Sequence, residues 1–119
     1  MAKIKLFVDD IRPCPDETWT LARTVSEAIS VINTFDFEII SLDHDISHQV
    51  IVGQTSRPFP CDETFTPVAI FIAEKYRDKD KKPEIIIHTS NPAGALRMSG
   101  ILEGFKVKRA EAIIVRRDI

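Results

Sequence analysis

The sequence predicts an α/β fold, a three-layer sandwich with a mainly parallel central sheet in which the first crossover helix is reduced or absent. Three short runs of mostly apolar, β-branched residues, at 4–8, 38–42 and 84–87, are typical of strands buried inside a parallel sheet. Segments with helical signals lie between them, and such alternation favours parallel pairing. A chain of 119 residues suits one domain, so we expect residues 1–119 to form a single unit.

The first half of the chain contains one unusual connection. Residues 9–18 join the first strand to a weaker predicted strand at 19–23, and this link contains two prolines. It is too short and too interrupted for a full crossover helix. Residues 24–27, Thr-Val-Ser-Glu, form a capping box that begins a helix. The apolar face of that helix is predicted to consist of Val25, Ala28, Ile29 and Ile32.

Two further helices are predicted by a polar N-cap residue followed by proline. Thr66 and Pro67 predict the N-cap and first turn of a helix over 68–77. The pair Asn91-Pro92 repeats this signal and predicts a helix that ends near Gly104.

The remaining segments are less regular. Residues 105–108 alternate apolar and polar side chains and predict an edge strand, and residues 113–117 favour a final strand. Residues 46–65 contain glycine and prolines without a clear pattern. A connection of this length in a small domain is typical of a long functional loop or lid.

Composition excludes some functions and permits others. Sixteen basic residues against eighteen acidic ones, with a formal charge of −2, argue against a long nucleic-acid groove but permit a local site for a small phosphorylated ligand. No apolar run approaches the roughly twenty residues of a membrane span. The chain start does not resemble a signal peptide, and Cys14 and Cys61 have no metal-ligand spacing. We therefore expect reduced thiols and a cytoplasmic location.

Polar side chains follow each of the three buried strands. The carboxyl ends of parallel strands share one edge of a sheet, so these residues should converge there. Crowded carboxylates are costly unless a cation or a shared proton relieves them, which favours a functional site. The structural alternative stays open, because an Asp after a strand often only caps a turn. The residues concerned are Asp9, Asp10 and Arg12; Asp43, His44 and Asp45; and His88, Thr89, Ser90 and Asn91.

These residue types suggest three roles. Hard carboxylate oxygens suit Mg²⁺ or Mn²⁺, so Asp9, Asp10, Asp43 and Asp45 are candidate metal ligands. The histidines, which titrate near neutral pH, are candidate acid and base. The candidate catalytic residues are His44, His88, Asp43 and Asp10.

A phosphate group could bind beside the helix that begins at Asn91, since a helix N-terminus offers free N–H groups. The candidate substrate-binding residues are Arg12, Thr89, Ser90, Asn91 and Arg97. Guanidinium groups can bind phosphate oxygens bidentately. The alternative for both arginines is that they neutralise the carboxylates.

The segments LFVDDIRPCP, TLARTVSEAI, IISLDHD and IIIHTSNPAGALRM resemble the cyclic-phosphate-processing receiver-like domain, a variant of the response-regulator receiver fold found in phages and bacteria. The resemblance covers nearly the whole chain, except residues 46–65 and the C-terminal tail. It implies a receiver- or flavodoxin-like fold, with Asp9 and Asp10 as the acidic pair of the first strand. It places Asp43 where ordinary receivers accept a phosphoryl group, and Thr89 or Ser90 at the hydroxyl position of the fourth strand.

The departures from ordinary receivers also carry information. His44 and His88 have no counterpart in phosphorelay receivers, which argues against a phosphorelay switch and favours hydrolysis. The leading hypothesis is a phosphoesterase that acts on a cyclic phosphate, either a cyclic nucleotide or a 2′,3′-cyclic phosphate end.

Two other functions remain open at this point. One is a non-catalytic module that binds a cyclic nucleotide or a partner protein. The other is a Toprim-like or aspartate-nucleophile metal-dependent phosphotransfer enzyme, suggested by the element ISLDHD. It fits less well. The Toprim pattern requires a Glu after the first strand, where this chain has Asp9 and Asp10, and the phosphatase pattern has its acidic pair near the N-terminus, whereas LDHD is central here.

Overall fold

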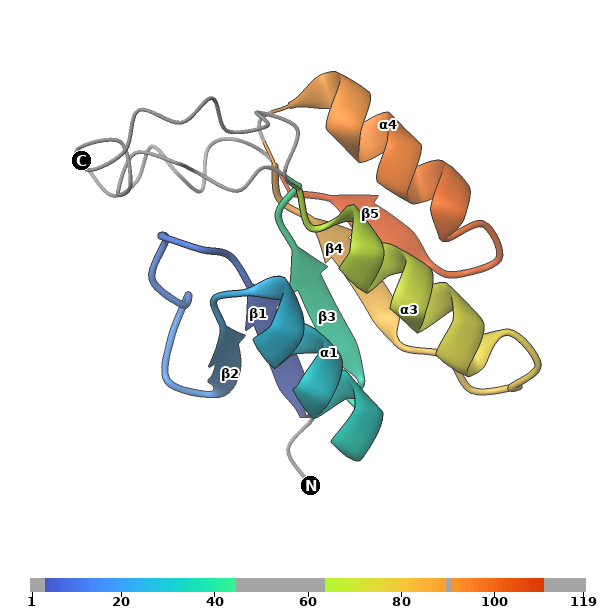
Figure 1. The fold of residues 1–119 in the computed structure, drawn as a ribbon, viewed down its shortest axis with the longest axis horizontal. Helices are drawn as coiled ribbons and strands as arrows, with labels where there is room; N and C mark the ends of the chain where they lie inside the picture. Colours follow the sequence, from blue (N-terminus) through green and yellow to red (C-terminus); the bar gives the residue numbers. More distant parts are fainter. Residues whose placement is uncertain (1–3, 45–63, 90, 111–119) are drawn as a thin grey trace.

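A five-stranded parallel sheet organises the protein. The structure is a computed structural model that describes residues 4–44, 64–89 and 91–110. The strand order is β2-β1-β3-β4-β5, and every neighbouring pair is parallel (Figure 1). The elements in chain order are β1 (Lys5–Val8), β2 (Trp19–Ala22), α1 (Val25–Thr34), β3 (Ile39–Leu42), α3 (Thr66–Tyr76), β4 (Glu84–Ile87), α4 (Pro92–Ile101) and β5 (Val107–Arg109).

In the described part of the chain, three helices cover one face of this sheet (Figure 1), with α3 packed between α1 and α4. The strand order explains this arrangement. From β2 onward, each connection moves across the sheet in the same direction, so right-handed crossovers place all three helices on one face. The step from β1 to β2 runs the other way, and a right-handed helix there would cover the opposite face. Residues 9–18 contain no helix, as predicted.

The expected three-layer sandwich is therefore not what the described residues form. They form two layers, the sheet and the helices, because the connection that would start the third layer is too short for a helix. The strand at residues 113–117 was also predicted, and it lies outside the described residues.

The apolar core fills the space between sheet and helices. Alternate strand residues are fully buried there, and they pack with buried residues of the three helices. The strand residues are Leu6, Val8, Ile40, Leu42, Ile85 and Ile87, and the helix residues include Ile32, Ile72 and Met98. Because side chains alternate along a strand, Phe7 and Ser41 belong to the other face.

The helix starts follow the capping signals with one correction. The Thr24 hydroxyl accepts a hydrogen bond from the Glu27 amide at 3.0 Å, so the predicted N-cap of α1 is confirmed. The N-cap of α3 is Phe65 and not Thr66. Thr64 takes over the capping contact, since its hydroxyl accepts a hydrogen bond from the Thr66 amide at 3.1 Å.

The two ends of the long connection between β3 and α3 lie next to each other. The Phe65 amide donates to the His44 carbonyl at 2.8 Å, at the carboxyl edge of the sheet. Residues 45–63 lie outside the described part of the chain, so the predicted loop at 46–65 is described only at its end. Among residues 4–44, 64–89 and 91–110, no helix is long and apolar enough to cross a membrane.

Candidate functional site

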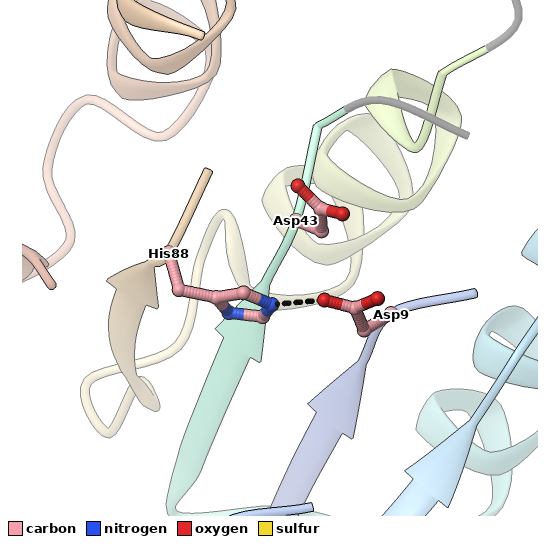
Figure 2. Close-up of side chains that lie close together, drawn as sticks. All are labelled: Asp9, Asp43 and His88. Carbon is pink, nitrogen blue, oxygen red and sulfur yellow. Dashed lines mark hydrogen bonds and ion pairs between the residues drawn. The ribbon is translucent and has the colours of Figure 1, made fainter. Parts of the chain in front are cut away.

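Asp9, Asp43 and His88 meet at the carboxyl edge of the sheet (Figure 2). They directly follow β1, β3 and β4, which are neighbouring strands. One ligand atom from each residue lies within 4.8 Å of the others. All three side chains are buried, and Asp9 is fully buried. The structure therefore brings together three of the residues that the strand-end argument expected to converge.

Continued strand pairing aims these side chains at the sheet face opposite the helices. The pairing extends one residue past each strand, since the Asp43 amide donates to the Val8 carbonyl at 3.0 Å and the His88 amide to the Leu42 carbonyl at 2.9 Å. Asp43 therefore shares the face of Ser41, two residues before it.

The imidazole of His88 is held on three sides. Its Nε2 lies 2.9 Å from Asp9 Oδ2 and its Nδ1 lies 2.7 Å from Ser41 Oγ. Its ring stacks on Phe7 with centroids 4.6 Å apart and planes 5° from parallel. Because an ionised carboxylate only accepts hydrogen bonds, Nε2 carries a proton and donates it to Asp9. In the neutral ring, Nδ1 then accepts from the Ser41 hydroxyl.

Sequence reasoning missed Ser41 and Phe7 as parts of this site. The available signal was a single hydroxyl residue inside the otherwise apolar strand IISL. A buried polar residue in such a strand needs a partner, and only the structure identifies that partner as His88.

Arg12 joins the two carboxylates. Its Nη1 lies 2.9 Å from Asp9 Oδ2, 3.6 Å from Asp43 Oδ2 and 3.5 Å from the His88 carbonyl oxygen. The other oxygen of Asp9 accepts hydrogen bonds from the amides of Ile11 and Arg12 at 3.0 and 2.9 Å, which forms a tight turn after β1.

Arg23 is a further residue that sequence reasoning did not select. Its Nη1 donates to the backbone carbonyls of Asp9 and Arg12 at 3.2 and 2.7 Å. Arg23 follows β2, the edge strand beside β1, so it fixes the turn that carries both site residues.

The two carboxyls differ in their pKa. Burial acts to raise the pKa of Asp9, but hydrogen bonds from His88 and from the amides of Arg12 and Ile11 outweigh it and lower the value to about 2. For Asp43, burial and then the nearby charge of Asp9 raise the pKa. Two adjacent carboxyls with opposite shifts are typical of a site that moves a proton or binds a cation.

The other predicted residues that the structure describes lie outside this group. The imidazole of His44 lies against Gly94 in the first turn of α4, and Asp10 is half-buried. Neither belongs to the three-residue group. The Asn91 side chain caps α4 by accepting from the Gly94 amide at 3.0 Å, and the buried Thr89 hydroxyl accepts from the Asn91 amide at 3.1 Å.

The remaining candidates have less direct relations to the group. Arg97 is exposed on α4 and does not belong to the three-residue group. Cys14 is a free, half-buried thiol. Asp45, Ser90 and Cys61 lie outside the described residues.

Comparison with known proteins identifies the family. Residues 4–104 match the cyclic-phosphate processing receiver domain. The chain belongs to this family. The receiver domain of the Francisella response regulator 1452 is similar in structure, with 15% sequence identity and a TM-score of 0.49 over 98% of this chain and 94% of that chain. No curated protein matches the chain significantly. Processing of cyclic phosphates implies a phosphorylated substrate.

The residues of this cyclic-phosphate processing domain fit a divalent cation. Two buried carboxylates and one imidazole lie close enough to share an ion. Carboxylate oxygens suit Mg²⁺ and Mn²⁺, and an imidazole is tolerated better by Mn²⁺. Asp9 and Asp43 were predicted as ligands from the sequence, whereas His88 joins them through the fold.

A separate cavity of about 920 Å³ lies at the opposite edge of the sheet. Glu38 and Glu84, which line it, come directly before β3 and β4, whereas the site residues follow those strands. Its lining mixes lysines with acidic residues. Among its lining residues, Asp36 pairs with Lys75 and accepts a hydrogen bond from Tyr76. The candidate site of this family member is the buried group at the carboxyl edge, where two carboxyls and an imidazole lie close enough to share an ion.

Proposed function

We propose that this domain hydrolyses a cyclic phosphate, either a cyclic nucleotide or a 2′,3′-cyclic phosphate end. The observation that carries the proposal is the meeting of Asp9, Asp43 and His88 in one buried group beside the guanidinium of Arg12. Membership of the cyclic-phosphate processing family supports the substrate class.

Opening a cyclic phosphate needs charge relief on its oxygens, an activated water and an acid for the leaving oxygen. We assign the phosphate to the space beside the first turn of α4, where amide N–H groups favour an anion. The proposed substrate-binding residues are Arg12, Thr89, Ser90, Asn91 and Arg97. Of these, Arg12 lies beside the buried group, where its guanidinium neutralises the carboxylates, as the structural alternative predicted.

The proposed catalytic residues are His44, His88, Asp43 and Asp10, and the geometry favours different tasks for them. His44 lies against Gly94, beside the proposed phosphate position, and suits proton transfer to the leaving oxygen. Both ring nitrogens of His88 are engaged by Asp9 and Ser41, so His88 orients Asp9. Asp43, whose pKa is raised by burial and by Asp9, suits the task of proton acceptor from water.

A divalent cation fits the same place. The proposed ligands are Asp9, Asp10, Asp43 and Asp45, and His88 would join them once its Nε2 gives up the proton that it now donates to Asp9. When bound, Mg²⁺ or Mn²⁺ would relieve the charge of the phosphate and lower the pKa of a bound water.

A non-catalytic binding module is the second candidate. It is favoured by the satisfied contacts of His88, because an imidazole engaged at both nitrogens is not poised for proton transfer. Such a module would bind a cyclic phosphate through Arg12 and α4 without cleaving it.

Product analysis separates the two functions. The protein is incubated with cyclic mononucleotides, cyclic dinucleotides and RNA with 2′,3′-cyclic ends, each with Mg²⁺, with Mn²⁺ and with chelator. If the domain is a hydrolase, at least one of these cyclic substrates should give a linear phosphate product. Stoichiometric binding without product under every condition would refute hydrolysis and support the binding module.

Substitutions test the residue roles. His44→Ala should abolish turnover without changing the far-UV circular dichroism spectrum, and His88→Gln should lower it while substrate binding persists. Arg77→Gln, on the exposed C-terminal end of α3, is the matched control and should retain the wild-type rate. Wild-type rates in both histidine variants would exclude these assignments.

A further inference from the structure

One nitrogen atom of Arg12 contacts both carboxylates of the candidate cation site. Nη1 is within 3.6 Å of Asp9 Oδ2, Asp43 Oδ2 and the His88 carbonyl oxygen. Two of these contacts are to carboxylate oxygens of the group that could hold a metal ion, and the third is to the backbone of its histidine. The guanidinium therefore occupies the position from which a cation would neutralise both carboxylates.

We infer that Arg12 is the resident counter-cation of the Asp9–Asp43 pair, and that a divalent cation displaces its guanidinium, which then becomes available to the phosphate of the substrate. This inference rests on the proposed function of the site. It assigns Arg12 two successive partners, the carboxylates before the cation binds and the phosphate afterwards.

Charge explains why the two cations exclude each other. Arg12 supplies one positive charge to two buried carboxylates, whereas Mg²⁺ or Mn²⁺ supplies two. A guanidinium and a divalent ion at the same oxygens would repel each other strongly in this buried setting. The divalent ion binds oxygen ligands directly, so it should replace the guanidinium.

The backbone anchors of Arg12 keep the displaced side chain near the site. Its amide donates to Asp9 Oδ1 at 2.9 Å and its carbonyl accepts from Arg23 Nη1 at 2.7 Å. The side chain is 26% exposed, so it has an open direction in which to move. Arg12 thus remains at the mouth of the site, where a guanidinium can bind phosphate oxygens bidentately.

Calorimetric titration with Mn²⁺ alone tests the competition. If the guanidinium must leave first, the apparent affinity is reduced by the fraction of molecules in which it has left. Arg12→Gln should therefore bind Mn²⁺ about tenfold more tightly than the wild type, a change expected from removal of one competing contact. Arg77→Gln removes the same charge at the other edge of the sheet and should match the wild type.

Two outcomes would overturn the inference. One is an Arg12→Gln variant that binds Mn²⁺ no more tightly than the wild type. The other applies if Arg12→Gln does not fold in the absence of metal. In that case the inference expects Mn²⁺ to take the place of the guanidinium and to restore the circular dichroism spectrum of the folded protein. A variant that stays unfolded in Mn²⁺ would show that the ion does not replace the guanidinium.

Inorganic phosphate tests the second partner of Arg12. Mg²⁺ should strengthen phosphate binding by the wild type and should do so less in Arg12→Gln, whereas equal strengthening in both would overturn the assignment to phosphate. These binding measurements do not depend on turnover. If Arg12 and the metal compete but no cyclic phosphate is cleaved, this inference stands and the proposed function is wrong. If a cyclic phosphate is cleaved but Arg12 and the metal do not compete, the proposed function stands and this inference is wrong.

Discussion

At the scale of single residues, Asp9 and Asp43 show how one sheet edge gives two carboxyls opposite properties. Asp9 accepts hydrogen bonds from His88, from two backbone amides and from Arg12, so its charged form is stabilised despite full burial. Asp43 is also buried but has fewer such contacts and faces the charge of Asp9. Hydrogen bonding therefore decides the difference, since burial acts on both in the same direction.

Asp9→Asn should destabilise the fold by about 2 kcal/mol at neutral pH. The folded-state pKa of Asp9 is about 2, below the usual 3.8 of an aspartate side chain. Its ionised form therefore stabilises the native state above pH 4, and this contribution is lost as the pH falls from about 4 to about 2. Urea unfolding should show a gap between the wild type and Asp9→Asn that closes over this range. A gap that stays constant with pH would contradict the pKa assignment, and Asp80→Asn on the surface serves as control.

Asp43→Asn should stabilise the fold at neutral pH, by about 1 kcal/mol. Because burial and Asp9 raise the pKa of Asp43, its charged form is less stable in the folded state than in the unfolded state. The asparagine side chain carries no charge, and its oxygen can still accept the hydrogen bond that the His44 backbone amide donates to Asp43 at 2.8 Å. Thermal unfolding should show a higher Tm at pH 7 and a smaller advantage at acidic pH. A lower Tm at pH 7 would show that Asp43 contributes more to the fold through Arg12 than burial costs.

At the scale of secondary-structure elements, α4 is shaped by its contact with the residue that follows β3. A Cβ atom built on Gly94 would lie 2.4 Å from the His44 ring, whereas one on Gly100 would meet nothing within 4 Å. The two glycines of this helix therefore differ in their structural role. The first permits close approach of His44, and the second only weakens the helix.

The two glycines give a matched pair of substitutions. Gly94→Ala should destabilise the protein by about 2 kcal/mol, as overpacking does, and should move the His44 ring. Gly100→Ala should instead stabilise it by up to about 1 kcal/mol through helix propensity. Thermal unfolding of both variants, with NMR signals of the His44 ring, measures these effects. Equal changes in stability would mean that the contact between Gly94 and His44 is not tight in solution.

At the scale of the whole molecule, the sheet has helices on one face in its described part, and β2 forms an edge. The single tryptophan of the chain, Trp19, lies in β2, and its ring meets that of Phe7 with centroids 6.0 Å apart. Its fluorescence therefore reports on the edge of the sheet beside the site, whereas far-UV circular dichroism reports mainly on the three helices.

We predict that residues 1–119 unfold in one cooperative transition, because Ala22 of the edge strand belongs to the same buried core as all three helices. Tryptophan fluorescence and circular dichroism should then give the same midpoint in urea, the usual test of two-state unfolding. An earlier fluorescence transition would show that β2 detaches before the core unfolds, and would contradict the single-domain expectation.

Much of the fold follows from local sequence patterns. The five described strands and three helices were all predicted close to their observed positions, because β-branched runs, the Thr24 and Asn91 caps and the proline signals act over a few neighbouring residues. The missing crossover helix was also foreseeable, since residues 9–18 are too few to form one. The one-residue error at Thr66 arose because two threonines compete for the capping contact, and the choice of Thr64 depends on how the chain reaches α3.

The position of acidic residues and histidines after three apolar, β-branched runs was enough to predict that they gather at one edge of the sheet. Which of them touch could be learned only from the folded chain. His88 binds Asp9 across β3, Arg12 bridges Asp9 to Asp43, and His44 turns toward α4. Ser41 and Phe7 became part of the site in the same way. The reason is physical: strand periodicity fixes the face on which a side chain lies, but its partners come from strands distant in sequence and depend on sheet order and register.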